Sequence, residues 1–73
     1  TYEMALQQAQ GQLRRDEAQL ANARVLLERY RTLLEQDSIA RQEVDTQAAL
    51  VAQLEGTLAT NRAAVGSARL NLS

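Results

Sequence analysis

Leucine recurs at every seventh position through the first half of the chain. The series is Leu6, Leu13, Leu20, Leu27 and Leu34. Because seven residues make almost two turns of an α-helix, these leucines fall on one stripe of the helix surface. Most positions three residues further on are small or polar, and Leu26 and Leu33 widen the stripe toward its end. The pattern predicts one long helix over about residues 2–36.

A second series of apolar residues, also spaced by seven, follows in the other half of the chain. It comprises Val44, Val51, Leu58, Val65 and Leu72. The step from Leu34 to Val44 is ten residues, so the second series does not continue the phase of the first. The break at residues 35–39 contains the turn-forming residues Asp37 and Ser38. We expect a turn at about residues 37–39 and a second helix over about residues 40–72.

The two series can be paired in one antiparallel register, in which the two residue numbers of each pair add up to 78. The pairs are Leu34 with Val44, Leu27 with Val51, Leu20 with Leu58, Leu13 with Val65, and Leu6 with Leu72. This register also brings Asp16 toward Arg62 and Arg24 toward Glu55. Such ion pairs, if exposed, stabilise by only ~0–1 kcal/mol each, but they favour one register.

The fold class predicted by this pairing is all-α, a two-helix antiparallel coiled-coil hairpin with arms about 50 Å long. The leucine repeat alone also fits a parallel leucine zipper. The break in phase, and the lack of the basic region found in DNA-binding zippers, argue against that alternative.

Composition supports a helical chain and excludes several kinds of site. Ala, Leu, Arg and Glu make up 39 of the 73 residues, as is typical of long helices and coiled coils. The chain has no Cys, His, Trp, Phe, Pro or Lys. These absences exclude a disulfide framework, a Cys/His zinc site and catalysis by His or Cys.

Neither charge nor hydropathy points to a nucleic acid or to a membrane span. The net charge is −1 and the arginines do not cluster beyond Arg14–Arg15, whereas nucleic-acid binders normally carry a basic stripe with stacking aromatic residues. No apolar run approaches the roughly 20 residues of a membrane helix. The first residues, Thr1 and Tyr2, include no initiator Met, and we expect the chain to be a piece of a longer protein.

No catalytic, cofactor-binding or metal-binding motif appears in the sequence. The acidic pairs Asp16–Glu17 and Glu43/Asp45 lie on a regular helical pattern beside arginines, which favours a solvated helix surface. There is no glycine-rich phosphate loop and no nucleophile elbow. We therefore expect no enzyme activity, cofactor or metal in this segment.

The residues around the predicted turn carry the most specific signal. Arg29 is followed four residues later by Leu33, and Arg41-Gln42-Glu43 opens the second helix. This stretch resembles the hairpin tip of periplasmic adaptor proteins, also called membrane-fusion proteins, of tripartite multidrug efflux pumps of the resistance-nodulation-division (RND) class. Residues 5–13 and 20–24 resemble the first arm of the MdtA-type subgroup, so the resemblance covers essentially the whole chain.

The resemblance implies a role in assembling an export conduit. It implies that hairpins of several protomers stand side by side as a hollow ring. Their tips would contact an outer-membrane channel of the TolC or OprM type. An inner-membrane RND transporter would bind domains outside these residues, in the periplasm of a Gram-negative bacterium. At the tip, Leu33 would supply an apolar contact and Arg29 hydrogen-bond donors.

One position departs from the family's pattern. Ala40 stands where the family's tip carries a Ser that would form a capping box with Glu43. Because alanine cannot cap, we expect Asp37 or Ser38 to do so and to start the second helix earlier. A channel contact through this position is also in doubt.

Other interpretations of the same residues stay open at this point. Arg29 also fits a solvated helix charge, Leu33 an extension of the core on the side of Leu26, and Tyr30 packing near the turn. For the whole chain, the alternatives are the adaptor hairpin of a type I secretion system and a purely structural coiled-coil arm of a scaffold or chaperone. The sequence identifies no exported substrate, ring size or particular channel.

Overall fold

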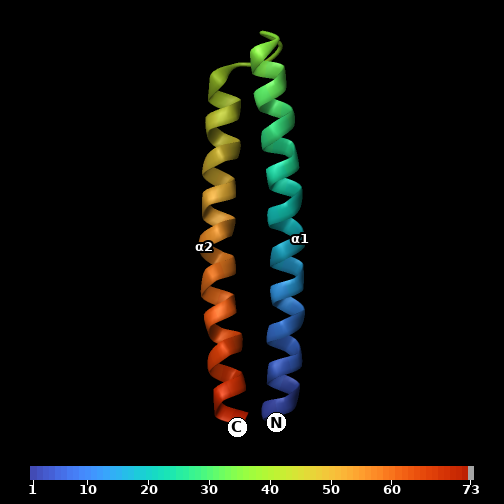
Figure 1. Ribbon diagram of the computed structural model, residues 1–73, viewed down its shortest axis with the longest axis vertical. Coiled ribbons are helices and arrows are strands. Elements are labelled where there is room, and N and C mark those ends of the chain that lie inside the picture. Colours follow the sequence, from blue (N-terminus) through green and yellow to red (C-terminus); the bar gives the residue numbers. More distant parts are fainter. Residues whose placement is uncertain (73) are drawn as a thin grey trace.

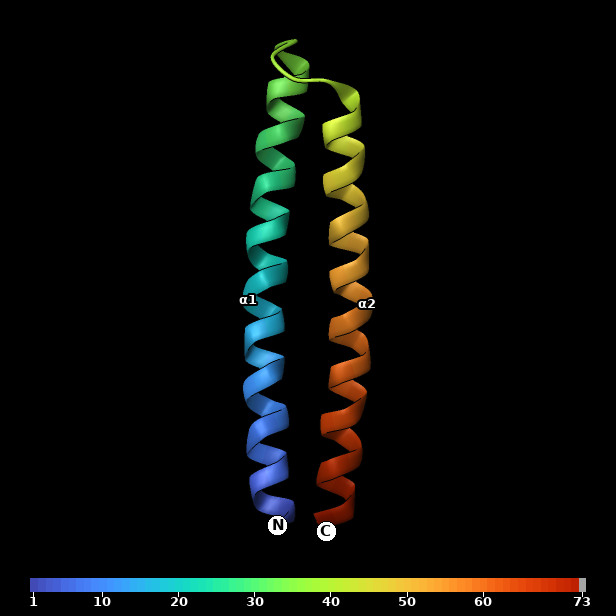
Figure 2. The same cartoon turned by 180° about the vertical axis from the view of Figure 1, so that it is seen from behind.

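The chain forms two long antiparallel helices that lie side by side along their whole length (Figures 1 and 2). The computed structural model describes residues 1–72, with side chains through residue 70. Helix α1 spans Tyr2–Glu35 and helix α2 spans Arg41–Leu72. The Cα atoms extend over 54 × 14 × 12 Å. The predicted all-α hairpin is confirmed, and the described residues include no strand.

The core is a single row of apolar residues between the helices. Its buried cluster comprises Leu20, Ala23, Leu27, Val44, Val51 and Leu58. Leu34 and Leu13 pack against this cluster, and Val65 is also buried. The leucine and valine positions from 13 to 65 that were assigned to the seam from their spacing therefore do form it. The expected pair of Leu6 with Leu72 lies outside the described side chains.

One layer of the seam is polar. The carboxyl group of Asp16 is buried, with 4% of the residue exposed. It accepts a hydrogen bond from Nδ2 of Asn61 and lies 3.6 Å from Nη2 of Arg15. The expected pair of Asp16 with Arg62 is wrong, because Asp16 faces into the seam while the next residue after Asn61 is turned about 100° away around α2.

The other expected ion pair, Arg24 with Glu55, is present at 3.8 Å beside the seam. A second polar contact crosses the seam closer to the tip, where Nε2 of Gln47 donates to the backbone oxygen of Ala23 at 3.0 Å. The small side chain of Ala23 leaves room for this approach. Among the described residues, no buried side-chain nitrogen or oxygen lacks a hydrogen-bond partner.

Helix α1 ends in a Schellman motif. Asp37 adopts a left-handed backbone with φ of 57°. The amide of Ser38 donates to the oxygen of Leu33 at 2.7 Å, and the amide of Asp37 donates to that of Leu34 at 3.0 Å. These two bonds are the pair that defines the motif. Helix α1 therefore stops at Glu35, and residues 36–40 form the link to α2.

Helix α2 starts without a side-chain cap. Ser38 directs its hydroxyl to the oxygen of Gln36, at 3.5 Å, and Asp37 belongs to the end of α1. The expectation that Asp37 or Ser38 caps α2 and starts it earlier is therefore wrong. The helix begins at Arg41, where the oxygen of Ala40 accepts from the amide of Glu43 at 3.1 Å.

Candidate functional site

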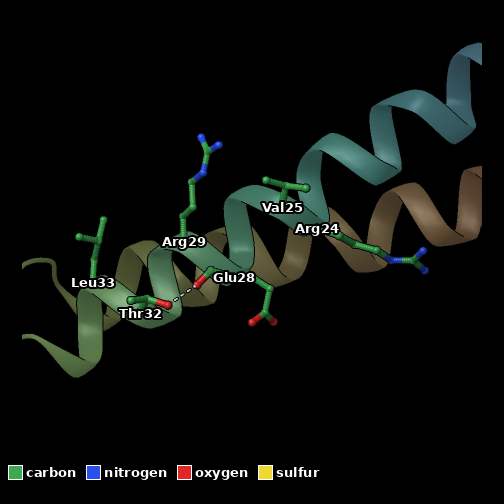
Figure 3. Close-up of a pocket in the computed structure, with 6 residues that line it drawn as sticks. All are labelled: Arg24, Val25, Glu28, Arg29, Thr32 and Leu33. Carbon is green, nitrogen blue, oxygen red and sulfur yellow. Dashed lines mark hydrogen bonds between the residues drawn. The ribbon is translucent and has the colours of Figure 1, made fainter.

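A shallow, mainly apolar groove runs along the outer surface of α1 in its last three turns. It is lined by Arg24, Val25, Glu28, Arg29, Thr32 and Leu33. Val25, Arg29 and Leu33 are spaced by four, so they lie on one strip of the helix. Figure 3 shows the side chains of Arg29 and Leu33 projecting from the same side of α1, away from α2. The structure thus brings together two residues proposed from the sequence.

The charges around the groove leave Arg29 without a partner. Arg24 pairs with Glu55 on α2, and Glu28 pairs with Arg31 at 2.9 Å. Among the described side chains, Arg29 makes no ion pair or hydrogen bond. Its guanidinium group therefore offers all its donors to another molecule, in the planar arrangement that suits carboxylates and carbonyl oxygens.

The apolar side of the groove is formed by Val25 and Leu33. Val25 is 50% exposed, and Leu33 is half-buried but does not belong to the core cluster. The interpretation of Leu33 as an extension of the core is therefore not supported. The hydroxyl of Thr32 donates to the backbone oxygen of Glu28 at 3.1 Å, as the dashed line in Figure 3 shows. This bond satisfies Thr32 within its own helix.

Ala40 lies apart from this groove. It lines a second hollow near the tip, together with Tyr30, Gln42, Glu43, Thr46 and Gln47. Ala40 is exposed and presents only a methyl group and its backbone. Tyr30 packs against the core cluster, as the packing interpretation predicted. The three proposed tip residues therefore divide between two surfaces.

Sequence reasoning missed Val25 and Thr32 as neighbours of Arg29 and Leu33. The signal was present, because Val25 stands four residues before Arg29, just as Leu33 stands four after it. Val25 is an apolar residue off the heptad series, so it had no place in the core and needed another explanation.

Neither a metal-binding cluster nor a membrane-spanning helix occurs in the residues that the structure describes. They contain no group of three or more His, Cys, Asp or Glu side chains placed to hold a metal ion. Within the same residues, neither helix combines the length and apolar character needed to cross a membrane.

Comparison with known proteins identifies the family of the chain. The family model described as "RND MFP, alpha-helical hairpin domain", where MFP stands for membrane-fusion protein, matches residues 5–73. A curated relative from Escherichia coli O17:K52:H18, named "Multidrug resistance protein MdtA", is 51% identical over 97% of this chain. The protein of the same name from Pantoea ananatis is 50% identical over 99% of the chain. No solved structure gives a significant match.

The chain spans only 17% of the length of the first of these relatives and 18% of that of the second. The family model describes a helical hairpin, in agreement with the two antiparallel helices of the structure. The chain belongs to the family of α-helical hairpin domains of RND membrane-fusion proteins.

Proposed function

We propose that this hairpin is the docking arm of a periplasmic adaptor in an RND-type multidrug efflux pump of a Gram-negative bacterium. The observation that carries the proposal is the family match over residues 5–73, combined with a groove near the hairpin tip that contains an unpaired arginine. The family model is specific to RND membrane-fusion proteins, which favours this function over a type I secretion adaptor or a structural arm.

The tip would dock on an outer-membrane channel of the TolC or OprM type. Arg29 and Leu33 lie within two turns of the end of α1, so a partner that approaches end-on reaches both. The guanidinium of Arg29 would donate to carbonyl or carboxylate oxygens of the channel, and Leu33 with Val25 would bury a small apolar contact. Compact sites that combine an arginine with apolar anchors commonly carry most of the binding energy of an interface.

The remaining surface would serve assembly. Copies of the hairpin would stand side by side around the conduit for export, and the RND transporter would contact parts of the adaptor outside this hairpin. The role is one of binding and assembly, without enzymatic chemistry, cofactor or metal.

Site-specific photo-crosslinking in cells tests the docking step. The segment of the Escherichia coli relative that matches this chain is replaced by the chain itself, and a photoreactive residue is placed at Leu33. A matched chimera carries the probe at Gln19, in the middle of α1. We expect a channel adduct from position 33 and none from position 19. Substituting Arg29→Ala in the same chimera should reduce the adduct.

Expression and membrane recovery of both chimeras provide the control for folding. If position 33 gives no channel adduct while the chimera is present at the normal level, the docking proposal fails. An equal yield from both positions contradicts it as well, because it would place the contact along the arm rather than at the tip.

A further inference from the structure

The apolar residues of the seam do not by themselves define the height of one helix on the other. Both apolar series step by seven residues. If α2 slides along α1 by seven residues, which is about 10 Å, all but one member of each series again meet a member of the other. Because a strict repeat of this kind allows several registers, another feature of the seam must select one.

The link between the helices does not exclude such a slide. Residues 36–40 connect Glu35 to Arg41, and the six steps between these two residues, at about 3.3–3.6 Å each, can span roughly 20 Å. A displacement of about 10 Å between helices that pack 8–10 Å apart requires less than this length. The hydrogen bonds that end α1 join the link to α1 alone, so they are kept at any height of α2.

The ion pair beside the seam opposes a slide in one direction only. Arg24 lies 3.8 Å from Glu55. If α2 moved by seven residues toward the two chain ends, Glu55 would meet Glu17, which has the same charge. If α2 moved toward the tip, Glu55 would meet Arg31, which has the opposite charge. A different contact must therefore prevent the slide toward the tip.

The polar layer of the seam is lost by that slide. Asp16, which is 4% exposed, accepts its hydrogen bond from Nδ2 of Asn61. The slide would carry Asn61 to the height of Ala23 and leave the carboxylate of Asp16 facing Ala68. Arg15 belongs to the same helix as Asp16, so this contact does not distinguish one register from another. The slide is disfavoured because it leaves a buried carboxylate without its partner across the seam.

Gln47 opposes the same slide. Its side chain is buried, and its Nε2 donates to the backbone oxygen of Ala23 at 3.0 Å. The slide would bring Gln47 to Tyr30, which stands seven residues after Ala23 and packs against the core cluster. The ring of Tyr30 would cover the backbone that the methyl group of Ala23 leaves open, so the buried amide would lose its acceptor.

We propose that Asp16 and Asn61, supported by Gln47, are positioning residues that hold α2 at one height on α1 and so define the hairpin tip. The end of α1 and the start of α2 lie at the same end of the rod (Figure 1). A slide toward the tip would carry the start of α2 about 10 Å further out, and Arg29 and Leu33 would then lie behind the foremost part of the hairpin. This last consequence rests on the proposed docking function.

The distance between spin labels on the two helices, measured by pulsed electron paramagnetic resonance, tests the register. The labels are attached through Gln8→Cys in α1 and Ala49→Cys in α2, both at exposed positions of a chain without other cysteines. Because Gln8 lies near the chain ends and Ala49 nearer the tip, the slide lengthens their separation by up to about 10 Å. We expect one distance in the original sequence. Asp16→Leu with Asn61→Leu should add a second, longer distance in at least about one molecule in ten.

Two control variants separate the register from stability. Asp16→Asn keeps a side chain that can form a hydrogen bond with Asn61, so it should keep the single distance. Val51→Ala removes apolar contacts from the core cluster but leaves the polar pair in place. It should lower the urea midpoint without adding a second distance, because a role in stability alone does not alter the register.

Circular dichroism checks that each labelled chain keeps its helices. A single, unchanged distance in the helical Asp16→Leu/Asn61→Leu chain overturns the proposal, and so does the longer distance in either control variant. The spin-label distance is measured on the chain alone, without a channel. The register and the channel adduct at Leu33 can therefore fail independently.

Discussion

Asp37 is unfavourable at its position for two reasons, its backbone conformation and its negative charge. Its φ of 57° places it in the left-handed region, which costs an ordinary L-residue roughly 1–2 kcal/mol and glycine almost nothing. Its carboxylate also follows the carboxyl end of α1, where the helix dipole disfavours negative charge. We expect Asp37→Gly to raise the free energy of unfolding by about 1 kcal/mol, measured by thermal unfolding of the chain.

The variants Asp37→Ala and Asp37→Asn separate the two effects. Alanine removes the charge but keeps the steric cost of the left-handed backbone, so it should not reproduce the gain. Asparagine also removes the charge and tolerates this conformation, so it should give a small gain. If alanine stabilises the hairpin as much as glycine does, the backbone explanation is wrong.

Ala40 occupies the residue before α2, where a side-chain oxygen could accept a hydrogen bond from an amide of the first turn. At present the amide of Glu43 donates only to the backbone oxygen of Ala40. Ala40→Ser would place a hydroxyl within reach of the Glu43 amide, and the carboxylate of Glu43 could return a bond to the amide of residue 40. We expect a gain of ~0.5–2 kcal/mol in the free energy of unfolding. Urea denaturation measures this gain. Ser38→Ala is the control and should change little, because the hydroxyl of Ser38 makes only a long hydrogen bond to the oxygen of Gln36, and its amide bond to Leu33 is kept in alanine. If Ala40→Ser has the same urea midpoint as the original chain, the capping explanation is wrong and the amides of the first turn of α2 need no further acceptor.

The turn shows what sequence reasoning missed at this scale. Asp37 and Ser38 marked the break correctly, but both residue types serve equally as turn formers and as helix caps. Nothing in the sequence shows that Asp37 would take the left-handed conformation that closes α1. The cap of α2 was therefore assigned to residues that complete the preceding helix.

Between the helices, Asp16 and Asn61 form a polar layer within an apolar seam. Removing Asp16 leaves the half-buried amide of Asn61 without its partner, so Asp16→Leu alone should lower the free energy of unfolding by about 1–3 kcal/mol. Replacing both, Asp16→Leu with Asn61→Leu, should recover this loss, since two apolar residues can pack in the same space. A double-mutant cycle followed by urea denaturation measures the coupling. Additive effects of the two single changes would contradict the contact.

The layer formed by Asp16 and Asn61 shows which contacts the heptad spacing predicts and which it does not. The heptad register correctly placed Leu20, Leu27, Val44, Val51 and Leu58 in one core and brought Arg24 to Glu55. The register also paired Asp16 with Arg62, because two residue numbers that add up to 78 lie at the same level along the hairpin axis in this register. Whether a side chain enters the seam depends on its angle around the helix, and this angle selects Asn61 in place of Arg62.

At the scale of the whole molecule, the heptad repeat makes the hairpin a rod, and the number of apolar layers in its seam sets the length of this rod. The expected arm length of about 50 Å agrees with the 54 Å extent of the fold. The groove with Arg29 was not predicted as a surface, because it is formed by residues from three successive turns of α1. Val25, an apolar residue off the heptad series, was the one sign of this groove in the sequence.

The layered construction predicts how the rod tolerates a change in length. Duplicating residues 20–26 in α1 and residues 52–58 in α2 adds one complete heptad to each arm and preserves the antiparallel register, because the inserted blocks face each other. The lengthened chain should remain a helical hairpin, extend by about 10 Å in small-angle X-ray scattering, and unfold at a higher temperature because one apolar layer is added. Duplicating only residues 20–24 and 54–58 adds about one and a half helical turns to each arm but rotates the apolar stripe by about 140° around the helix, so this control should lose stability. Equal stability of the two lengthened chains would mean that helix propensity, rather than the layered seam, holds the rod together.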